Sequence, residues 1–289
     1  MMRQVTMLDL AAEYDVLADE VRNAVNTVLK SQQFIGGPAV AELETALSSR
    51  LGARHAIAVS SGTDALLCAM MAMGIGQGDE VVLPAFTFFA TAGSVARLGA
   101  KPVFVDIDPR TFNIDPSKIE AAVTDKTKAI IAVHLFGQCA EMDAINAVAA
   151  RHGLRVVEDA AQAIDATYHG RLAGTLGDVA CVSFYPTKNL GGFGEGGMIF
   201  TNDEDLAGIV RQLRNHGESQ RYMHERVGGN FRLDTTKAAI LLVKLRYLGE
   251  FTQRRRDNAE RYDELLKGTP VTTPHVPDYQ VTVYHQYSI

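Results

Sequence analysis

The sequence predicts an α/β fold, a three-layer sandwich in which helices cover both faces of a mostly parallel, mixed β-sheet. Short apolar runs alternate with amphipathic helical stretches from residue 55 onward, a pattern typical of strands joined by crossover helices. The 289 residues suffice for one large domain of this kind and part of a second. One connection, "YPTKNLGGFGEGG", is too short for a covering helix, so the strand after it is expected to return antiparallel.

Seven strands are expected in this sheet. Between the first five lie helical patterns such as "GTDALLCAMMAM" and "EMDAINAVAARHG", where Gly153 suits a helix end. This alternation implies right-handed crossovers between parallel strands. In chain order the strand candidates are "HAIAV" (55–59), "EVVL" (80–83), "PVFV" (102–105), "AIIAV" (129–133), "LRVVE" (154–158), "VACVSF" (179–184) and "GMIFT" (197–201), the last two antiparallel.

Helices flank this alternation on both sides. "VLADEVRNAVNTVLKSQ" and "PAVAELETALSSRLG" predict two helices before residue 55, with Pro38 in the first turn of the second. After residue 203, "EDLAGIVRQLRNHG" predicts a helix and "ESQRYMHERVGGNFRLD" a polar loop. One long helix from about Thr235 to Tyr262 is expected next, and then a strand, "VTVYHQYSI", which needs a partner.

Composition favours small-molecule chemistry in a reducing compartment. The net charge of -6 gives no electrostatic footprint for nucleic acid or an anionic membrane, so neither is expected as a partner. Cys68, Cys139 and Cys181 stand in apolar surroundings and suit a protein core in the cytoplasm. No apolar stretch is long enough to span a bilayer, and no zinc pattern occurs, so no metal site is expected.

Unusual polar residues follow several strands, at the edge where open α/β sheets bind ligands. "SSGT" (60–63) comes after the first strand and opens a helix, so it is either an anion site suited to phosphate or a simple capping loop. Asp159 ends the fifth strand, where a carboxylate needs a cationic partner: either a structural ion pair or a ligand. Ser183 lies on the sixth strand and Lys188 follows it; alone, Lys188 reads as a solvated loop lysine.

Together these groups suit one cofactor. Pyridoxal 5′-phosphate has a phosphate, a ring nitrogen best kept protonated, and an aldehyde that condenses with a lysine amine. Desolvation would lower the pKa of Lys188 toward a nucleophilic free amine. The GxGxG in "GGFGEGG" is a weak dinucleotide signal because a strand, not a helix, follows it. His134, after the fourth strand, either faces this pocket or is a hydrogen-bonded structural residue.

The sequence resembles the DegT/DnrJ/EryC1/StrS family of sugar aminotransferases, a branch of the fold-type-I enzymes similar to aspartate aminotransferase. The resemblance implies a large pyridoxal-phosphate-binding domain with N-terminal helices at 1–245. It also implies a linking helix and the start of a truncated small C-terminal domain at 246–289. The matching motifs, in the family's order, are "SGTDAL", "PAFTFFAT", "PVFVDID", "HLFGQ", "EDAAQA", "SFYPTKNLGGFGEGG", "NHG", "GGNFRLD" and "VYHQY".

The resemblance also implies roles for single residues. Lys188 would bond the cofactor aldehyde and later move protons, and Asp159 would keep the pyridine nitrogen protonated. Gln162 would contact the ring hydroxyl. The remaining cofactor contacts implied are Gly62, Thr63 and Ser183 at the phosphate, Phe88 stacked on the ring, and Asn230 at the phosphate of a neighbouring subunit. Arg232 would meet substrate.

The function implied is transfer of an amino group from glutamate to a nucleotide-linked keto-sugar, by a homodimer with shared active sites. Two alternatives stay open: a sugar dehydratase of the same family, and a non-catalytic member that senses a ligand or binds a partner. Dehydratases of the family generally lack the lysine, so Lys188 favours transamination. The chain departs from the family at Asp165, where a small residue is usual, and at Lys237, where glutamine is usual.

Overall fold

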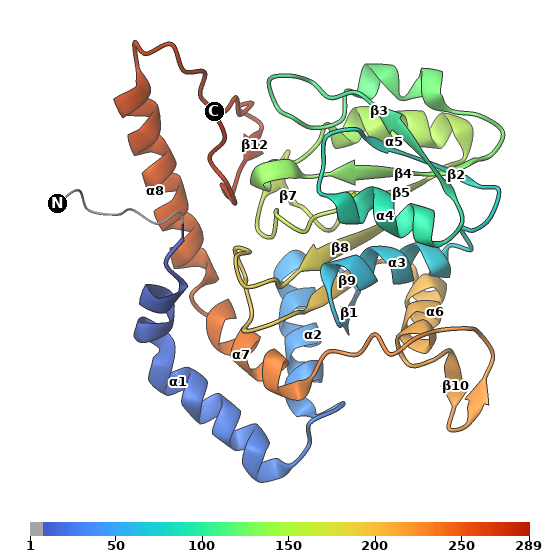
Figure 1. The fold of residues 1–289 in the computed structure, drawn as a ribbon, viewed down its shortest axis with the longest axis vertical. Helices are drawn as coiled ribbons and strands as arrows, with labels where there is room; N and C mark the ends of the chain where they lie inside the picture. The colour runs from blue at the N-terminus through green and yellow to red at the C-terminus, as the bar shows by residue number, and fades with distance from the viewer. Residues whose placement is uncertain (1–7) are drawn as a thin grey trace.

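The computed structural model describes residues 8–289 and has three layers, helices on either side of a seven-stranded sheet (Figure 1). The strand order is β1-β9-β8-β5-β4-β2-β3. Each predicted strand is present, with ends shifted by at most two residues. The bounds are β1 His55–Val59, β2 Glu80–Pro84, β3 Lys101–Val105, β4 Thr127–Val133, β5 Arg155–Asp159, β8 Val179–Ser183 and β9 Gly197–Thr201.

The sheet is mixed, as predicted, because one strand runs against the others. Strand β9 pairs antiparallel with β8 on one side and with β1 on the other. The pairs β2–β3, β2–β4, β4–β5 and β5–β8 are all parallel. The glycine-rich turn that follows β8 therefore reverses the chain directly into a neighbouring strand, without a crossover helix.

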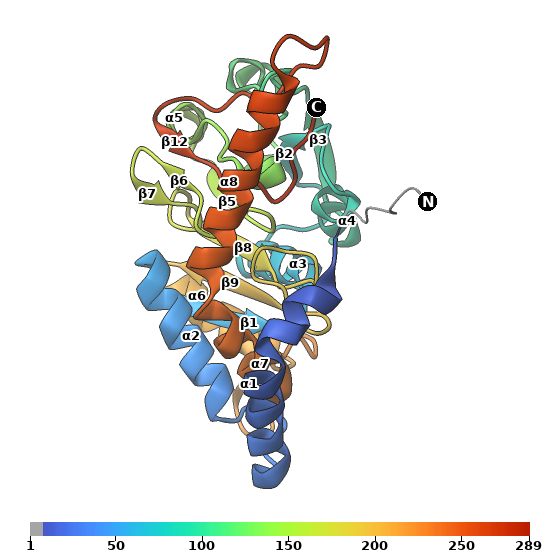
Figure 2. The same ribbon diagram turned by 90° about the vertical axis from the view of Figure 1, so that its left-hand side faces the viewer.

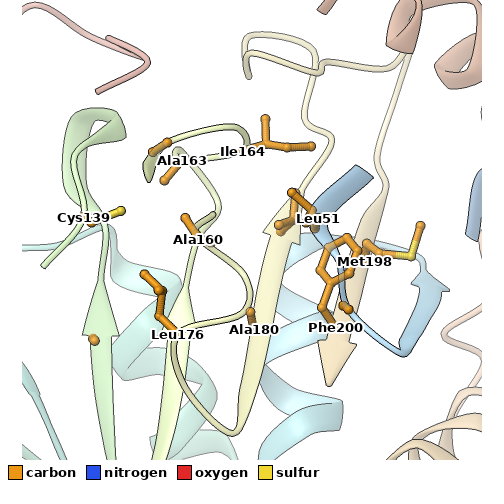
Figure 3. Close-up of a cluster of buried hydrophobic side chains, with 14 of the residues drawn as sticks. Leu51, Cys139, Ala160, Ala163, Ile164, Leu176, Ala180, Met198 and Phe200 are labelled. Carbon is orange, nitrogen blue, oxygen red and sulfur yellow. The ribbon is translucent and has the colours of Figure 1, made fainter. Parts of the chain in front are cut away.

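Alternating strand residues bury both faces of the sheet, which explains the near-continuous apolar runs. One face packs against α3 Gly62–Ala72, α4 Phe89–Arg97 and α6 Glu204–Arg214. The other packs against α2 Pro38–Leu51, α5 Met142–His152 and α7 Thr235–Leu245. Part of this second core is shown in Figure 3, where Leu51 of α2 lies against Met198 and Phe200 of β9.

Helix ends follow the predicted signals. Pro38 is the first residue of α2, where its missing N–H removes no intrahelical bond. Gly153 ends α5 in the left-handed conformation, with φ of 64°. The first helix, α1 Leu10–Ser31, begins earlier than the predicted stretch because Asp9 caps it by accepting from the N–H of Ala12 at 3.0 Å.

Three predictions for the last third of the chain need correction. The long helix is two helices: α7 ends at Leu245 and packs on α1 and α2, and α8 runs Leu248–Leu266, rising from α7 toward the other end of the molecule (Figure 2). The polar loop contains a short hairpin, β10 Glu218–Gln220 with β11 Met223–His224. The terminal strand is only β12 Gln280–Val281. The rest of "VTVYHQYSI" is irregular.

A small second sheet gives β12 its partner. Strand β12 pairs antiparallel with β6 Thr167–Tyr168, which pairs with β7 Arg171–Leu172. Because β6 has only two residues, no edge remains for a longer terminal strand. No helix among residues 8–289 is both long and apolar enough to cross a membrane. The three cysteines are free and buried, as expected for core residues.

Candidate active site

The carboxyl ends of neighbouring strands bring predicted site residues to one edge of the sheet. Asp159 ends β5, and Ser183 ends the adjacent strand β8. Gly197 of β9 pairs with Val59 on one side and with Ser183 on the other, so the end of β1 lies near the end of β8. Helix α3 begins at Gly62, just after β1. A phosphate site, a carboxylate and the lysine turn are thus neighbours.

Asp159 is a buried carboxylate at the end of β5. It is 6% exposed; its Oδ2 accepts from Thr91 Oγ1 at 2.8 Å and its Oδ1 from the Ala161 N–H at 3.3 Å. No basic side chain among residues 8–289 lies within 4 Å of it. Burial raises the pKa of Asp159, and the two hydrogen bonds and the charge of Lys188 oppose that rise. The site therefore calls for a cation.

Lys188 sits in a tightly packed turn. Its main-chain N–H donates to the carbonyl of Tyr185 at 2.8 Å. A side chain at residue 191 is impossible, because a Cβ there would lie 2.2 Å from the carbonyl oxygen of Pro186. Of the glycines at 191, 192, 194, 196 and 197, only Gly194 needs a positive φ, of 135°. The glycines therefore serve close packing around the lysine.

The amine of Lys188 is partly desolvated. Burial lowers the pKa of Lys188, and the negative charge of Asp159 opposes that shift. No carboxylate among residues 8–289 lies within 4 Å of the amine. The residue borders a cavity of about 440 Å³, here called the lysine cavity. Its lining includes Thr187, Lys188, Asn189, Arg255, Asn258 and the start of α1.

The start of α3 forms an anion cradle. A Cβ at Gly62 would lie 2.7 Å from the Cβ of Ser183, so only glycine lets the helix start approach β8 this closely. Ser61 caps the helix by accepting from the Asp64 N–H at 3.0 Å. The N–H groups of Gly62 and Thr63 have no partner within residues 8–289. Free N–H groups and the positive end of the helix dipole suit a phosphate.

Two further predicted contacts lie near Asp159. Oε1 of Gln162 accepts from the N–H of Phe136 at 2.7 Å, which leaves the amide nitrogen as a donor. Phe88 caps the start of α4, one turn before Thr91, and is 71% exposed. A ring this exposed is not a core aromatic and is available to cover a flat ligand.

Asn230 and Arg232 do not reach the lysine cavity. The carbonyl of Phe231, between them, accepts from the N–H of Ser60 at 2.8 Å, and Asn230 is exposed. Arg232 donates to Asn215 Oδ1 at 2.5 Å, and its buried Nε has no partner within residues 8–289. Arg232 lines a separate cavity of about 360 Å³ that shares no residue with the lysine cavity.

A buried polar centre beneath the site was not predicted. Glu158 is fully buried, and its carboxylate accepts from the N–H groups of Gly174, Leu176 and Gly177 at 2.6–2.8 Å. Its fourth donor is Nε2 of His134, at 2.9 Å. His134 is thus the structural histidine of the two alternatives. Glu158 precedes Asp159, so side chains must alternate across the strand and Glu158 needs its own partners on the opposite face.

The two residues at which the chain departs from the family, Asp165 and Lys237, each form an ion pair. Asp165 has a φ of 69°, and its carboxylate accepts hydrogen bonds from Nε and Nη2 of Arg50, at 2.8 and 2.5 Å. It stabilises the turn after β5 and does not face the lysine cavity. Lys237 pairs with Asp234 at 3.1 Å, one turn apart at the start of α7.

The chain matches known aminotransferases over almost its whole length. A sequence model described as the DegT/DnrJ/EryC1/StrS aminotransferase family matches residues 15–289. The chain is 53% identical over 288 residues to a "Pleiotropic regulatory protein" of Geobacillus stearothermophilus, covering 99% of this chain and 77% of that one. It is 49% identical over 285 residues to the UDP-2-acetamido-2-deoxy-3-oxo-D-glucuronate aminotransferase of Pseudomonas aeruginosa, covering 99% and 79%.

A solved structure shares the fold closely. The crystal structure of S. venezuelae DesV, in complex with a ketimine intermediate, superposes with a TM-score of 0.96 at 42% identity. The match covers 99% of this chain and 77% of that one.

Proposed function

The chain belongs to the DegT/DnrJ/EryC1/StrS aminotransferase family, and from this premise we propose an amino donor, a set of site residues and an assembly for it. It is a pyridoxal-phosphate-dependent aminotransferase that acts on a nucleotide-linked keto-sugar. The amino donor proposed is glutamate. Its three free, buried cysteines support a place in the cytoplasm.

The observation that carries this proposal is the unpaired carboxylate of Asp159. A buried carboxylate without a cation is costly, and the protonated ring nitrogen of the cofactor is the cation that would complete the pair. Thr91 and Ala161 hold the carboxylate in one orientation. The described residues therefore fit pyridoxal phosphate, which when bound supplies an electron sink for the bonds around the reacting carbon.

The other proposed contacts follow from groups left free by the fold. The N–H groups of Gly62 and Thr63 and the hydroxyl of Ser183 would bind the phosphate. The oxygen of Ser183 accepts from the N–H of Tyr185 at 3.2 Å, and this bond leaves the hydroxyl proton available to donate. The amide nitrogen of Gln162 would donate to the ring hydroxyl, and the exposed ring of Phe88 would cover the cofactor face.

Lys188 is proposed as the catalytic base. Burial keeps a larger share of its amine neutral near pH 7, and a neutral amine can take a proton from the substrate carbon and return it. Nζ is free to move because no carboxylate within residues 8–289 holds it. The packed turn holds the main chain in place, so the side chain alone carries the proton.

A homodimer with shared sites is also proposed. Asn230 is exposed, so its side chain is available to a neighbouring chain, and the buried Nε of Arg232 has no partner within residues 8–289. A twofold axis would let each chain lend this segment to its neighbour reciprocally. Asn230 would then donate to the neighbour's phosphate and Arg232 would meet its substrate.

Mixed dimers test the sharing. Lys188→Ala and Asn230→Asp are each expected to be nearly inactive, the second because it places a carboxylate against the phosphate. When the two variants are unfolded together and reassembled, about half the dimers carry one intact site and one doubly altered site. Activity should return to about a quarter of wild type. No recovery in dimers verified by mass would place Asn230 in the site of its own chain.

Conversion of a keto-sugar tests the function. A UDP-linked 3-oxo-sugar is the first substrate to try, because the Pseudomonas relative is named for one. The expected result is glutamate-dependent formation of an amino-sugar nucleotide, followed by mass. Loss of a hydroxyl group instead would identify a dehydratase. Binding of the sugar nucleotide with no turnover of any donor would favour the sensing alternative.

A further inference from the structure

Arg255 is a partly buried cation with no acidic partner among residues 8–289. It lies on α8, and its Nη1 donates to the carbonyl oxygens of Tyr284 at 3.3 Å and His285 at 3.2 Å. No carboxylate among residues 8–289 lies within 4 Å of it. Burial lowers the pKa of Arg255; the charge of Glu13 opposes this, but the carboxylate of Glu13 is paired with Lys244. A cation in such a place calls for an anionic ligand.

The segment that holds Arg255 is itself fixed. Nε of the next residue, Arg256, donates to the carbonyl of Thr282 at 3.0 Å. Asn189, which follows Lys188, donates to the carbonyl of Val283 at 2.9 Å. Residues 282–285 are therefore tied both to α8 and to the lysine turn, and they hold the guanidinium of Arg255 at a fixed position near Lys188.

His285 adds an unsatisfied polar group. Its Nδ1 is buried and has no partner within residues 8–289. Burial and the charges of Lys188 and Arg255 together lower the pKa of His285 to about 3. The imidazole is therefore neutral near pH 7, and both neighbouring charges that act on it are positive.

The side chains of Lys188, Arg255 and His285 border two adjoining cavities. Arg255 lines both the lysine cavity and a second cavity of about 670 Å³, which also includes His285 and which we call the terminal cavity. Both volumes suit a small molecule. The two carboxylates at the lysine cavity are already committed: Asp9 caps α1, and Glu13 pairs with Lys244.

We propose that Arg255 binds a carboxylate of the amino-acid donor, with His285 as a second hydrogen-bonding group. The two main-chain carbonyls occupy Nη1, which leaves Nε and Nη2, the pair that binds a carboxylate in bidentate fashion. This inference rests on the proposed function, because it takes glutamate as the donor. It adds a residue that separates donor recognition from recognition of the sugar nucleotide.

The first test compares the two substrates. Arg255→Gln should raise the KM for glutamate about 10- to 100-fold, as expected when a charge-assisted hydrogen bond is lost, and leave the KM for the keto-sugar within about twofold. Arg256→Gln is the matched control: it removes the same charge and a similar main-chain contact, but Arg256 lines neither cavity. Equal effects of the two variants, or an effect on the sugar alone, would overturn the proposal.

A binding test needs no turnover. Calorimetry with glutarate, an unreactive dicarboxylate, should show binding to wild type that weakens about tenfold or more in Arg255→Gln and persists in Arg256→Gln. Uridine diphosphate, as the probe for the other anionic substrate, should bind all three alike. If Arg255→Gln weakens uridine diphosphate binding instead, the guanidinium serves the nucleotide and the proposal fails.

A further measurement on wild type covers a variant that fails to fold. Glutarate should protect Arg255, but not Arg256, from an arginine-modifying dicarbonyl reagent, with both sites read by peptide mass. Equal modification of Arg255 with and without glutarate would contradict the proposal. If wild type transfers no amino group from glutamate, the proposed function fails by itself, and the glutarate experiments still decide whether Arg255 is a carboxylate site.

Discussion

Glu158 offers the sharpest stability prediction, because its carboxylate has four buried donors. Oε1 accepts from Leu176 and Gly177, and Oε2 from Gly174 and His134. In Glu158→Gln, one of the two positions becomes an NH₂ group that faces two N–H donors whichever way the amide turns. His134 cannot adapt by moving its proton, because its Nδ1 already accepts from the N–H of Ala140 at 3.1 Å.

The magnitude follows from the lost bonds. A hydrogen bond to a charged group contributes about 1.5–3 kcal/mol, so the loss of two lowers the free energy of unfolding by about 3–6 kcal/mol. That is a large share of the roughly 5–15 kcal/mol that a domain has. Because the strand continues directly into Asp159, cofactor affinity should fall as well.

Urea unfolding monitored by circular dichroism measures the loss. Glu120→Gln is the matched control: this carboxylate also binds a histidine, His152, and an arginine, Arg151, but it lies half-exposed on the surface. The control should leave the midpoint almost unchanged. A loss of less than about 1 kcal/mol for Glu158→Gln would refute the reasoning, because it would mean that the buried donors find other acceptors.

Three further predictions concern the site and its support. Burial raises the carboxyl pKa of Asp159 in the folded chain, so the free energy of unfolding falls as pH rises from the unfolded pKa of about 3.9 through the folded value. Without cofactor, Asp159→Asn should therefore have a higher Tm than wild type at pH 7. Equal Tm values in calorimetry at that pH would count against this. Arg50→Ala should cost more in urea unfolding than Asp165→Gly, because the first strands a mostly buried carboxylate and the second relieves a positive φ; the reverse order would contradict this. Gly62→Ala should weaken cofactor binding at least tenfold in a fluorescence titration, because its Cβ would lie 2.7 Å from the Cβ of Ser183 and displace the phosphate cradle; an unchanged affinity would contradict this.

Hydrophobic pattern predicted the sheet well, because the strands other than the edge strand β3 are largely buried on both faces and so are apolar throughout. The edge of the sheet that carries the site could be predicted from the strand order, since Asp159 and Ser183 end neighbouring parallel strands. The pattern did not reveal the break between α7 and α8, because the apolar period runs through it and the nearby glycine, Gly249, lies inside α8 and not at the break. The break at Arg246 and Tyr247 separates α7, in which seven of 11 residues are buried, from α8, in which three of 19 are.

Partner availability explains the remaining differences. The stretch "VTVYHQYSI" alternates like a strand, but its neighbour β6 offers only two residues for pairing. Thr91 lies within a quoted motif, yet its bond to Asp159 joins residues 68 apart in the chain and no local signal marks it. Glu158 had one overlooked signal: two adjacent acids at a buried strand end must point to opposite faces, so each needs partners of its own.

The claim that Lys188 is the residue that bonds the cofactor is tested most directly by chemical trapping. Borohydride reduction of the protein with bound pyridoxal phosphate should fix the cofactor on Lys188. Trypsin would then fail to cleave there, so the added mass should appear on a peptide spanning residues 172–211. Glutamate added before the reduction should abolish the label, and Lys188→Ala should never acquire it. A label on any other lysine, or an undiminished label in Lys188→Ala, would contradict the account.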